Sequence, residues 1–323
     1  MSDLRAGVIG VGYLGNFHAE KYKKIPGVQL IGVVDTNFER TRQVAHRYGV
    51  QAYKDYEALL PHIDLVSIVV PSGKHYRVAK DCLNAGIHCL VEKPLTELVS
   101  HATELISTAR RKNVVLQVGH LERFNPVARK ISSLVKLPEL VRARRFSQYQ
   151  SRGTETDVIL DLMIHDLDIV LSLAEGDVKS VQATGTRVVT DFIDIANARI
   201  VFSNGLVAEL QASRVSSETV RDTEIHANGD IYELNYLTHE VNVSCVSNDG
   251  EKTKKSIPVF DENKPRSDAL YEELAAFVSS VTNGSLPIVT GEDGKKALEL
   301  AVEISKRIKL SEGNLTPSIT NSD

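Results

Sequence analysis

A glycine-rich turn near the N-terminus of the 323-residue sequence is the first segment with a recognisable chemistry. Gly10-Val11-Gly12-Tyr13-Leu14-Gly15 fits G-x-G-x-x-G, follows an apolar run and opens a helix-length segment, which is the context in which this pattern binds a dinucleotide. Gly10 permits a tight turn, Gly12 lets the backbone approach a pyrophosphate, and Gly15 lets helix and strand pack closely. We expect Tyr13 and Leu14 to contact the cofactor, and the helix expected over Asn16–Lys24 to offer its first N–H groups to the phosphates, the alternative being a plain glycine turn.

An acidic residue, Asp35, ends the second expected strand twenty residues after Gly15. Its carboxylate can accept hydrogen bonds from both ribose hydroxyls and would repel a 2′-phosphate. The sequence therefore favours NAD over NADP as the cofactor, although Arg40 lies five residues further along and can attract a phosphate. Asp35 is also suited to cap the helix expected near Phe38, and this role is compatible with ribose binding.

A lysine lies where the fifth expected strand, residues 88–91, comes to its end. Glu92-Lys93-Pro94 follows that strand directly, and ligands of open α/β sheets bind at the carboxyl ends of the strands. Lys93 can hydrogen-bond a substrate hydroxyl and stabilise a developing alkoxide. The alternative for a single lysine is a solvated strand end.

Asp161 and His165 interrupt a helix expected over Asp157–Leu173 that is otherwise apolar nearly all round. Such a helix is usually buried, so its polar residues need partners. Side chains four residues apart share one face of an α-helix, and an imidazole titrates near neutrality, which suits proton abstraction from an alcohol. Asp166 and Asp168 point elsewhere and are expected to support the helix. The alternative is a solvated face or a structural histidine.

Residues 122–152 hold eight basic and two acidic residues, hence a local charge of +6 in a chain whose net charge is −4. Arginine side chains suit phosphates and carboxylates, so an anionic substrate is one interpretation. Solvated side chains on a helix and an edge strand are the other. We expect at least one of Tyr149, Gln150 and Arg152, in the approach to the Asp161 helix, to touch substrate.

Two domains are expected from the arrangement of these segments. Residues 1–121 alternate continuous apolar strands with helices, which predicts an α/β Rossmann domain with a doubly wound parallel sheet. Residues 122–323 hold the Asp161 helix, several strand-like runs with period-two character and two closing helices. They predict an α+β domain for substrate binding and oligomerisation, with an open, mostly antiparallel sheet.

The composition excludes several classes of protein. Apolar residues make up 42% and charged residues 25%, as in ordinary globular proteins. The nearly balanced charge argues against general nucleic-acid binding, because neutralising phosphates requires an excess of basic residues. Three cysteines without a C-x-x-C pair predict neither a disulfide framework nor a metal site. No run is apolar enough for a membrane span. We expect a cytoplasmic protein.

Together the motifs resemble the Gfo/Idh/MocA family, the group of glucose–fructose oxidoreductase and inositol dehydrogenase. The resemblance adds Val70-Pro71-Ser72 with His75, and residues 287–294 before the last helix. It implies a nicotinamide cofactor contacted by Pro71, His75, Glu92 and Lys93, and a Lys-Pro bond that is often cis. It also implies dimers or tetramers formed through the C-terminal sheet.

The resemblance implies three catalytic residues: Lys93 orients the substrate at the nicotinamide end, Asp161 is a substrate ligand and His165 is the proton acceptor. Residues 118–126 are similar to nucleotide-sugar members, which oxidise the 3-hydroxyl of a UDP-N-acetyl-sugar, and this assigns Arg123 and Asn125 to the substrate site. One alternative is a dehydrogenase of an uncharged sugar or cyclitol such as myo-inositol. Another is a non-catalytic sensor of NAD or sugar, which would not need all three catalytic residues.

Overall fold

The computed structural model describes residues 3–150, 155–246, 252–260 and 268–313 of the chain. It forms two compact units: the first comprises Met1–Asn125 and Pro265–Leu298, and the second comprises Pro126–Lys264 and Glu299–Asp323. The boundary expected after Leu121 lies four residues before this division. The alternation of strands and helices does not predict that residues 265–298 return to the first unit.

The first unit is built on a six-stranded sheet in the order β3-β2-β1-β4-β5-β6, in which every pair is parallel. This order confirms the doubly wound Rossmann arrangement, in which ligands bind at the carboxyl ends of the strands. The strands are β1 (Leu4–Ile9), β2 (Val28–Val34), β3 (Gln51–Tyr53), β4 (Leu65–Ile68), β5 (His88–Glu92) and β6 (Leu116–Gly119).

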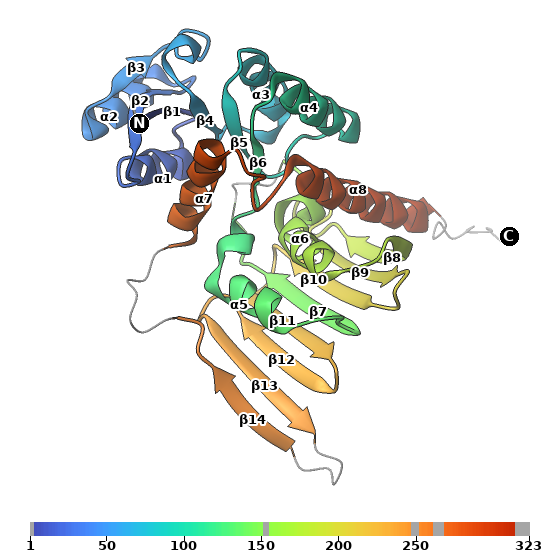
Figure 1. Cartoon of the computed structure of the whole chain (residues 1–323). Helices are drawn as coiled ribbons and strands as arrows, with labels where there is room; N and C mark the ends of the chain where they lie inside the picture. The colour runs from blue at the N-terminus through green and yellow to red at the C-terminus, as the bar shows by residue number, and fades with distance from the viewer. Residues whose placement is uncertain (1–2, 151–154, 247–251, 261–267, 314–323) are drawn as a thin grey trace, which may run out of the picture. The chain divides into compact units, whose positions relative to one another are not determined.

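Helices cover both faces of this sheet (Figure 1). One apolar cluster joins β1 and β2 to the helices α1, α2 and α7, and it includes Tyr22 and Phe277. The helices α3 and α4 pack against each other on the other side. The helical elements are α1 (Tyr13–Tyr22), α2 (Phe38–Tyr48), α3 (His75–Asn84), α4 (Val99–Lys112), α7 (Ala269–Asn283) and the short turns η1 (Leu60–His62), η2 (Ser72–Lys74) and η3 (Leu121–Phe124).

The second unit is built on an eight-stranded sheet in the order β14-β13-β12-β11-β7-β10-β9-β8. All neighbours are antiparallel except β7 and β10, so the expected mostly antiparallel sheet is confirmed. The strands are β7 (Leu140–Phe146), β8 (Val178–Thr186), β9 (Ile195–Phe202), β10 (Val207–Ser213), β11 (Val220–Ala227), β12 (Asp230–Asn235), β13 (Glu240–Val246) and β14 (Lys252–Ile257).

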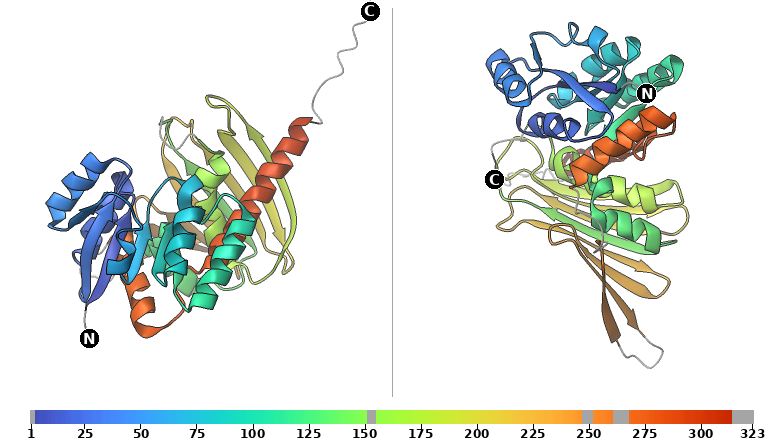
Figure 2. Two further views of the ribbon diagram at one scale, coloured as in Figure 1. Left: turned by 90° about the horizontal axis from the view of Figure 1, so that it is seen from above. Right: turned by 60° about the vertical axis from the view of Figure 1, so that its left-hand side comes forward.

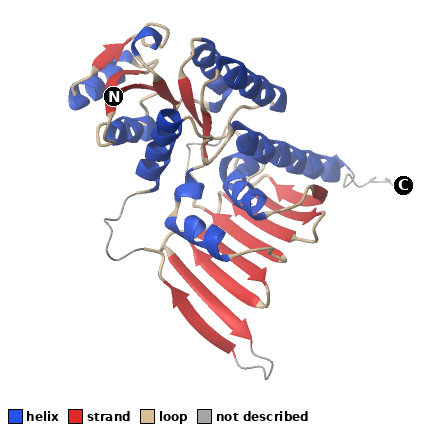
Figure 3. Cartoon of the chain, viewed as in Figure 1, coloured by secondary structure: helices blue, strands red, loops and turns tan. Residues whose placement is uncertain are grey.

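The helices of the second unit cover one face of its sheet, and no described helix covers the other face (Figures 2 and 3). Residues alternate along β7: Val141 and Ala143 face the apolar core, whereas Arg142 and Arg144 face outward. The helical elements are α5 (Pro126–Leu134), η4 (Ile159–Met163), α6 (Ile164–Leu173) and α8 (Gly291–Gly313), whose first turns belong to the first unit. Among the described helices, none is both long and apolar enough to cross a membrane.

Candidate functional site

The glycine-rich turn between β1 and α1 contains two positions that only glycine can occupy. Gly10 has a φ of +89°, and a Cβ there would lie 2.3 Å from the carbonyl oxygen of Val69. A Cβ on Gly15 would lie 1.8 Å from the carbonyl oxygen of Gly10, so Gly15 allows α1 to approach the turn. A Cβ on Gly12 would meet nothing within 4 Å. The turn therefore leaves room for a pyrophosphate at the start of α1.

Asp35, directly after β2, holds this turn in place. Its Oδ2 accepts the Val11 N–H at 3.0 Å, and its Oδ1 accepts the Asn37 N–H at 2.8 Å. Nη1 of Arg40 lies 3.4 Å from Oδ2, with Arg40 half exposed to solvent. The cap of α2 is Asn37, which accepts the Arg40 N–H, so the expected capping role belongs to Asn37 and not to Asp35.

His75 joins the turn after β4 to the turn after β5. Its Nδ1 lies 2.8 Å from the carbonyl oxygen of Pro94, and its Nε2 lies 2.8 Å from that of Val70. The Lys93-Pro94 bond is cis, as the family resemblance implies. Burial lowers the pKa of His75 even though both carbonyl groups act to raise it. The fully buried ring is thus placed to position Pro71 and Lys93, and its predicted cofactor contact stays a prediction.

Glu92 connects the backbone of Lys93 to the helix that follows the glycine turn. Its Oε1 lies 3.2 Å from Nε2 of His18, which is fully buried on α1, and its Oε2 accepts the Lys93 N–H at 3.3 Å. Gly119 pairs with Glu92 across the sheet, and a Cβ there would lie 2.9 Å from the Glu92 carboxyl carbon. Because Gly119 has no side chain, the space beside it is open to the carboxyl group of Glu92.

Asp161 and His165 lie on a helix that differs from the expected one at its start. The segment begins as a π-helix, η4, which holds Asp161, and continues as α6, in whose first turn His165 lies. Both side chains are half-buried. Because π-helical hydrogen bonds close at i+5, a four-residue spacing does not align the two side chains as it would in an α-helix. Short π-helical turns occur frequently at functional sites.

The helix α6 is fixed to the sheet by a buried ion pair between Asp166 and Arg145 of β7. Nη2 of Arg145 lies 2.8 Å from Oδ1 of Asp166, and Nε lies 3.0 Å from Oδ2. Asp168 is also buried. The expectation that these two aspartates support the helix is therefore confirmed for Asp166, whose partner is now identified.

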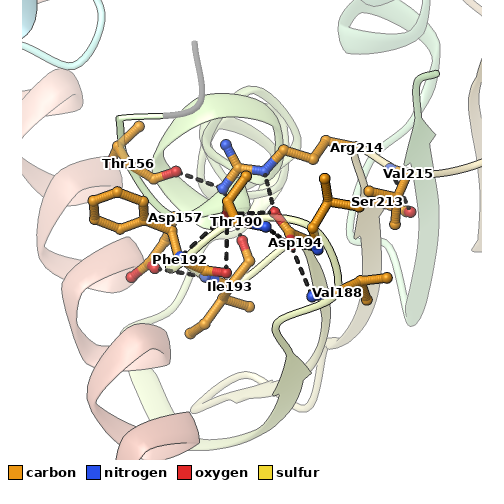
Figure 4. Close-up of polar contacts among 11 residues, drawn as sticks. Thr156, Asp157, Val188, Thr190, Phe192, Ile193, Asp194, Ser213, Arg214 and Val215 are labelled. Carbon is orange, nitrogen blue, oxygen red and sulfur yellow. Dashed lines mark hydrogen bonds and ion pairs between the residues drawn. The ribbon is translucent and has the colours of Figure 1, made fainter. Parts of the chain in front are cut away.

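A second buried network holds the chain at the entry to this helix (Figure 4). Nε of Arg214 lies 3.1 Å from Oδ1 of Asp194, and Nη2 of Arg214 donates to the carbonyl oxygens of Thr156 and Ile193. Oδ1 of Asp157 accepts the Ile193 N–H at 3.0 Å. Arg214 thus fixes the backbone three residues before the π-helical turn.

Three arginines of the basic segment are already paired within the second unit. Arg142 bonds Glu209 and Glu224, Arg144 bonds Asp222, and Arg145 bonds Asp166. The sequence-based count of +6 overlooks these partners, which come from other strands and from α6. These three arginines therefore give little support to an anion-binding segment.

The predicted site residues come from both units. The first unit holds Gly10, Gly12, Tyr13, Leu14, Gly15, Asp35, Arg40, Pro71, His75, Glu92, Lys93, Arg123 and Asn125. The second unit holds Tyr149, Asp161 and His165, whereas Arg152 lies outside the described residues. Tyr13 and Tyr149 are exposed, and Asn125 is buried at the end of η3.

Sequence reasoning missed His18, Glu273, Asp194 and Arg214, all of which are buried. One signal for Glu273 was available: an acidic residue lies between Leu270, Leu274 and Phe277 on the buried face of α7. For Asp194 and Arg214 the pairing partner is twenty residues away, and no local pattern indicates it.

Comparisons with known proteins agree with this architecture. Residues 4–120 match the model of the oxidoreductase family with an NAD-binding Rossmann fold, and residues 134–231 match the GFO/IDH/MocA C-terminal domain. The chain is similar to UDP-N-acetylglucosamine 3-dehydrogenase of Acidithiobacillus ferrooxidans, with 37% identity over 94% of this chain and 97% of that protein. A solved structure of that enzyme has a TM-score of 0.89 at 34% identity and covers 96% of this chain and 99% of that chain.

A more distant relative is myo-inositol 2-dehydrogenase of Thermotoga maritima, with 28% identity over 95% of this chain and 96% of that protein. The relatives thus include enzymes of nucleotide sugars and of cyclitols. The chain belongs to the Gfo/Idh/MocA family of oxidoreductases.

Proposed function

We propose that this protein oxidises the 3-hydroxyl of a UDP-N-acetyl-sugar with NAD⁺. The observation that carries the proposal is the 37% identity, over nearly the whole chain, to UDP-N-acetylglucosamine 3-dehydrogenase of Acidithiobacillus ferrooxidans. The geometry of the first unit fits the cofactor, because Gly12 leaves room for a pyrophosphate and Asp35 is held beside the glycine turn.

The proposed roles follow the chemistry of the side chains. Lys93 hydrogen-bonds the reacting hydroxyl, His165 accepts its proton, and Asp161 binds the substrate. NAD⁺, when bound, supplies the hydride acceptor. The protein's own contribution is positioning: Glu92 and His75 fix the backbone around Lys93, and the Arg145–Asp166 pair fixes α6 under His165.

The proposed cofactor is NAD and not NADP, because Asp35 ends β2 with a carboxylate. Two cations in the first turns of α2 are already engaged, because Arg40 pairs with Asp35 and Arg42 pairs with Glu39, and this lowers their availability to a 2′-phosphate. The residues proposed to hold NAD are Gly10, Gly12, Tyr13, Leu14, Gly15, Asp35, Arg40, Pro71, His75, Glu92 and Lys93. Arg123, Asn125, Tyr149 and Arg152 are proposed to contact substrate together with the catalytic residues.

One observation favours an uncharged sugar or cyclitol as the alternative substrate. Arg142, Arg144 and Arg145 are paired with carboxylates, so the basic segment is a weaker site for a UDP pyrophosphate than its charge suggests. The similarity to a myo-inositol 2-dehydrogenase points the same way. Both alternatives keep the proposed roles of Lys93 and His165.

The test follows NADH absorbance with NAD⁺ and a panel of UDP-N-acetylglucosamine, free N-acetylglucosamine and myo-inositol. A ketone trap is included because oxidation of an alcohol by NAD⁺ can stall at equilibrium. NADH formation with the UDP-sugar alone supports the proposal. NADH formation with myo-inositol or free N-acetylglucosamine would instead identify an uncharged sugar or cyclitol as the substrate. If no compound of the panel gives NADH although the protein binds NAD⁺, the result supports the non-catalytic sensor instead.

We further propose that copies of the chain associate in the cytoplasm as dimers or tetramers through the open face of the second unit's sheet. No described helix covers this face, and its side chains include Arg142 and Glu209 of neighbouring strands. Light scattering on the purified protein measures the number of chains. A monomer at micromolar concentration would contradict the assignment.

A further inference from the structure

Glu273 is an acidic side chain in the apolar interior of the first unit. It is 0% exposed, and neither of its carboxyl oxygens has a hydrogen-bond partner among the described residues. Leu270, Leu274 and Phe277, at neighbouring positions of α7, belong to the apolar cluster under β1 and β2. An ionised carboxylate is strongly disfavoured in such surroundings, so a group of this kind keeps its proton.

Glu92 and Glu273 both lie against β6: Glu92 pairs with Gly119 of that strand, and Gln117 of the same strand donates to the backbone carbonyl of Glu273. Burial raises the pKa of Glu273 well above its usual range, and the negative charge of Glu92 raises it further. Glu92 has better partners, because Nε2 of His18 lies 3.2 Å from its Oε1 and the Lys93 N–H donates to its Oε2. A buried carboxyl group without polar partners is the more costly of the two to ionise. The proton therefore belongs to Glu273.

The other polar groups of this interior come from α1, β4, β6 and η3. The helix α1 contributes His18 and Tyr22, whose hydroxyl lies 2.8 Å from Oγ of Ser67 on β4. Gln117 of β6 donates to the backbone carbonyl of Glu273 at 3.2 Å. The turn η3, which packs against α7, brings the buried Glu122 and follows the buried His120. Among the described residues of the first unit, no lysine or arginine is buried.

We propose that Glu273 and Glu92 form an acid pair that holds one proton, and that Glu273 is thereby a positioning residue for Lys93. While Glu273 is neutral, Glu92 stays directed at His18 and at the Lys93 N–H, and so links α1 to the end of β5. Loss of the proton sets two carboxylates against each other and draws Glu92 away from these partners. The inference rests on the proposed function and deepens it.

The protonation state is tested first, without any substrate. Infrared spectra of wild type and Glu273→Gln are compared at neutral pH, with Glu272→Gln, the next residue on α7, as the matched control. We expect the C=O stretching band of a protonated carboxyl group in wild type and in Glu272→Gln, and its loss in Glu273→Gln. A wild-type spectrum identical to that of Glu273→Gln in this band overturns the acid pair.

The positioning role is tested by the pH dependence of turnover. Glu273→Gln keeps a neutral side chain of the same shape at every pH, so its turnover stays close to wild type near neutrality and its alkaline limb moves to higher pH. Glu92→Gln removes the carboxylate that accepts the Lys93 N–H, and its turnover falls at every pH. An unchanged alkaline limb in Glu273→Gln overturns the role of Glu273.

A failure of the proposed function is distinguishable from a failure of this inference. If wild type oxidises none of the substrates tested, NAD⁺ affinity is measured against pH instead, because Glu92 also anchors α1. Affinity that falls at alkaline pH in wild type but not in Glu273→Gln supports the acid pair. Identical pH dependence in the two proteins overturns it.

Discussion

Arg145 and Asp166 form a two-point ion pair inside the second unit: Nη2 lies 2.8 Å from Oδ1, and Nε lies 3.0 Å from Oδ2. Their side chains are only 4% and 5% exposed. One partner belongs to β7 and the other to α6, next in sequence to His165. The pair therefore fixes the rotation of α6 on the sheet, and with it the direction of His165.

Replacement of Asp166 by Asn removes the carboxylate that Arg145 bonds at two points in the interior of the second unit. Removal of one partner of a buried ion pair typically costs about 3–5 kcal/mol, because the remaining charge is uncompensated. We expect Asp166→Asn to lower the free energy of unfolding of the second unit by about this amount. Denaturant unfolding followed by circular dichroism measures the loss, and NAD⁺ titration is expected to show unchanged affinity.

The matched control is Asp222→Asn, which breaks the pair with Arg144 on the open face of the same sheet. That pair is 56% and 30% exposed, and exposed pairs contribute only about 0–1 kcal/mol. A loss as large in Asp222→Asn as in Asp166→Asn would show that burial does not set the strength of these pairs.

The lowered pKa of the Asp194 carboxyl group predicts that the second unit loses stability at acidic pH. Burial acts to raise the pKa of its carboxyl group, but the N–H groups of Thr190, Val189 and Val188 and the Thr190 hydroxyl outweigh burial and lower the pKa to about 2. Because the folded-state pKa lies below the ordinary value of 3.8, stability from this group is complete above about pH 4. It is lost as the pH falls toward 2.

Acid unfolding of wild type and Asp194→Asn measures this contribution. The variant is expected to be less stable at neutral pH, since Arg214 loses its ion pair with Asp194, and to show a shallower dependence on pH between 4 and 2. Glu303→Gln, which breaks an exposed pair with Arg307 on α8, serves as the control and should keep the wild-type slope. Parallel slopes in all three proteins would exclude Asp194 as the titrating group.

The first unit is largely predictable from sequence because local signals agree there. Buried apolar runs end at Asp35 and Glu92, Asn37 caps α2, and Gly49 ends it in the left-handed conformation. The return of α7 to this unit is not predictable in the same way. Its apolar pattern indicates a buried face, but which surface Leu274 and Phe277 cover depends on tertiary packing.

The position of a site residue is predictable from sequence where the sheet topology determines it. It is not predictable where it depends on a hydrogen-bonding or ion-pair partner from a distant part of the chain. Lys93 lies at a strand end because parallel strands bring such residues to one edge. The π-helical turn at Asp161 is invisible in sequence, since an apolar pattern does not distinguish i+4 from i+5 hydrogen bonding. The sequence-based charge count includes Arg145 as one of the cations available to an anion. In the structure Arg145 points inward from β7 and pairs with Asp166, 21 residues away.

The pair of Asp35 with Arg40 predicts how cofactor preference can be changed. Asp35→Ala removes the proposed ribose ligand, and a hydrogen bond to a charged group contributes about 1.5–3 kcal/mol, so NAD⁺ affinity should fall by about tenfold or more. The same change releases Arg40, which lies 3.4 Å from Asp35, to receive a 2′-phosphate. The ratio of NADP⁺ to NAD⁺ affinity should therefore rise, as measured by fluorescence titration with each cofactor.

The double variant Asp35→Ala/Arg40→Ala separates the two effects. It should keep the loss in NAD⁺ affinity and lose the gain in NADP⁺ affinity. If the gain in NADP⁺ affinity persists without Arg40, another cation receives the phosphate.

Lys93→Met tests the reacting lysine, because methionine keeps a long unbranched side chain and removes the ammonium group. One hydrogen bond to a developing oxyanion contributes about 10²–10³ in turnover, so we expect a loss of about 100-fold or more with NAD⁺ affinity close to wild type. Single-turnover hydride transfer at saturating NAD⁺ measures this loss, with the exposed Lys54→Met as the control. Unchanged turnover would remove Lys93 from the reaction. A loss of NAD⁺ affinity as large as the loss of turnover would show that Lys93 acts through its cofactor contact alone, since catalysis requires an interaction that is stronger in the transition state than in the bound ground state.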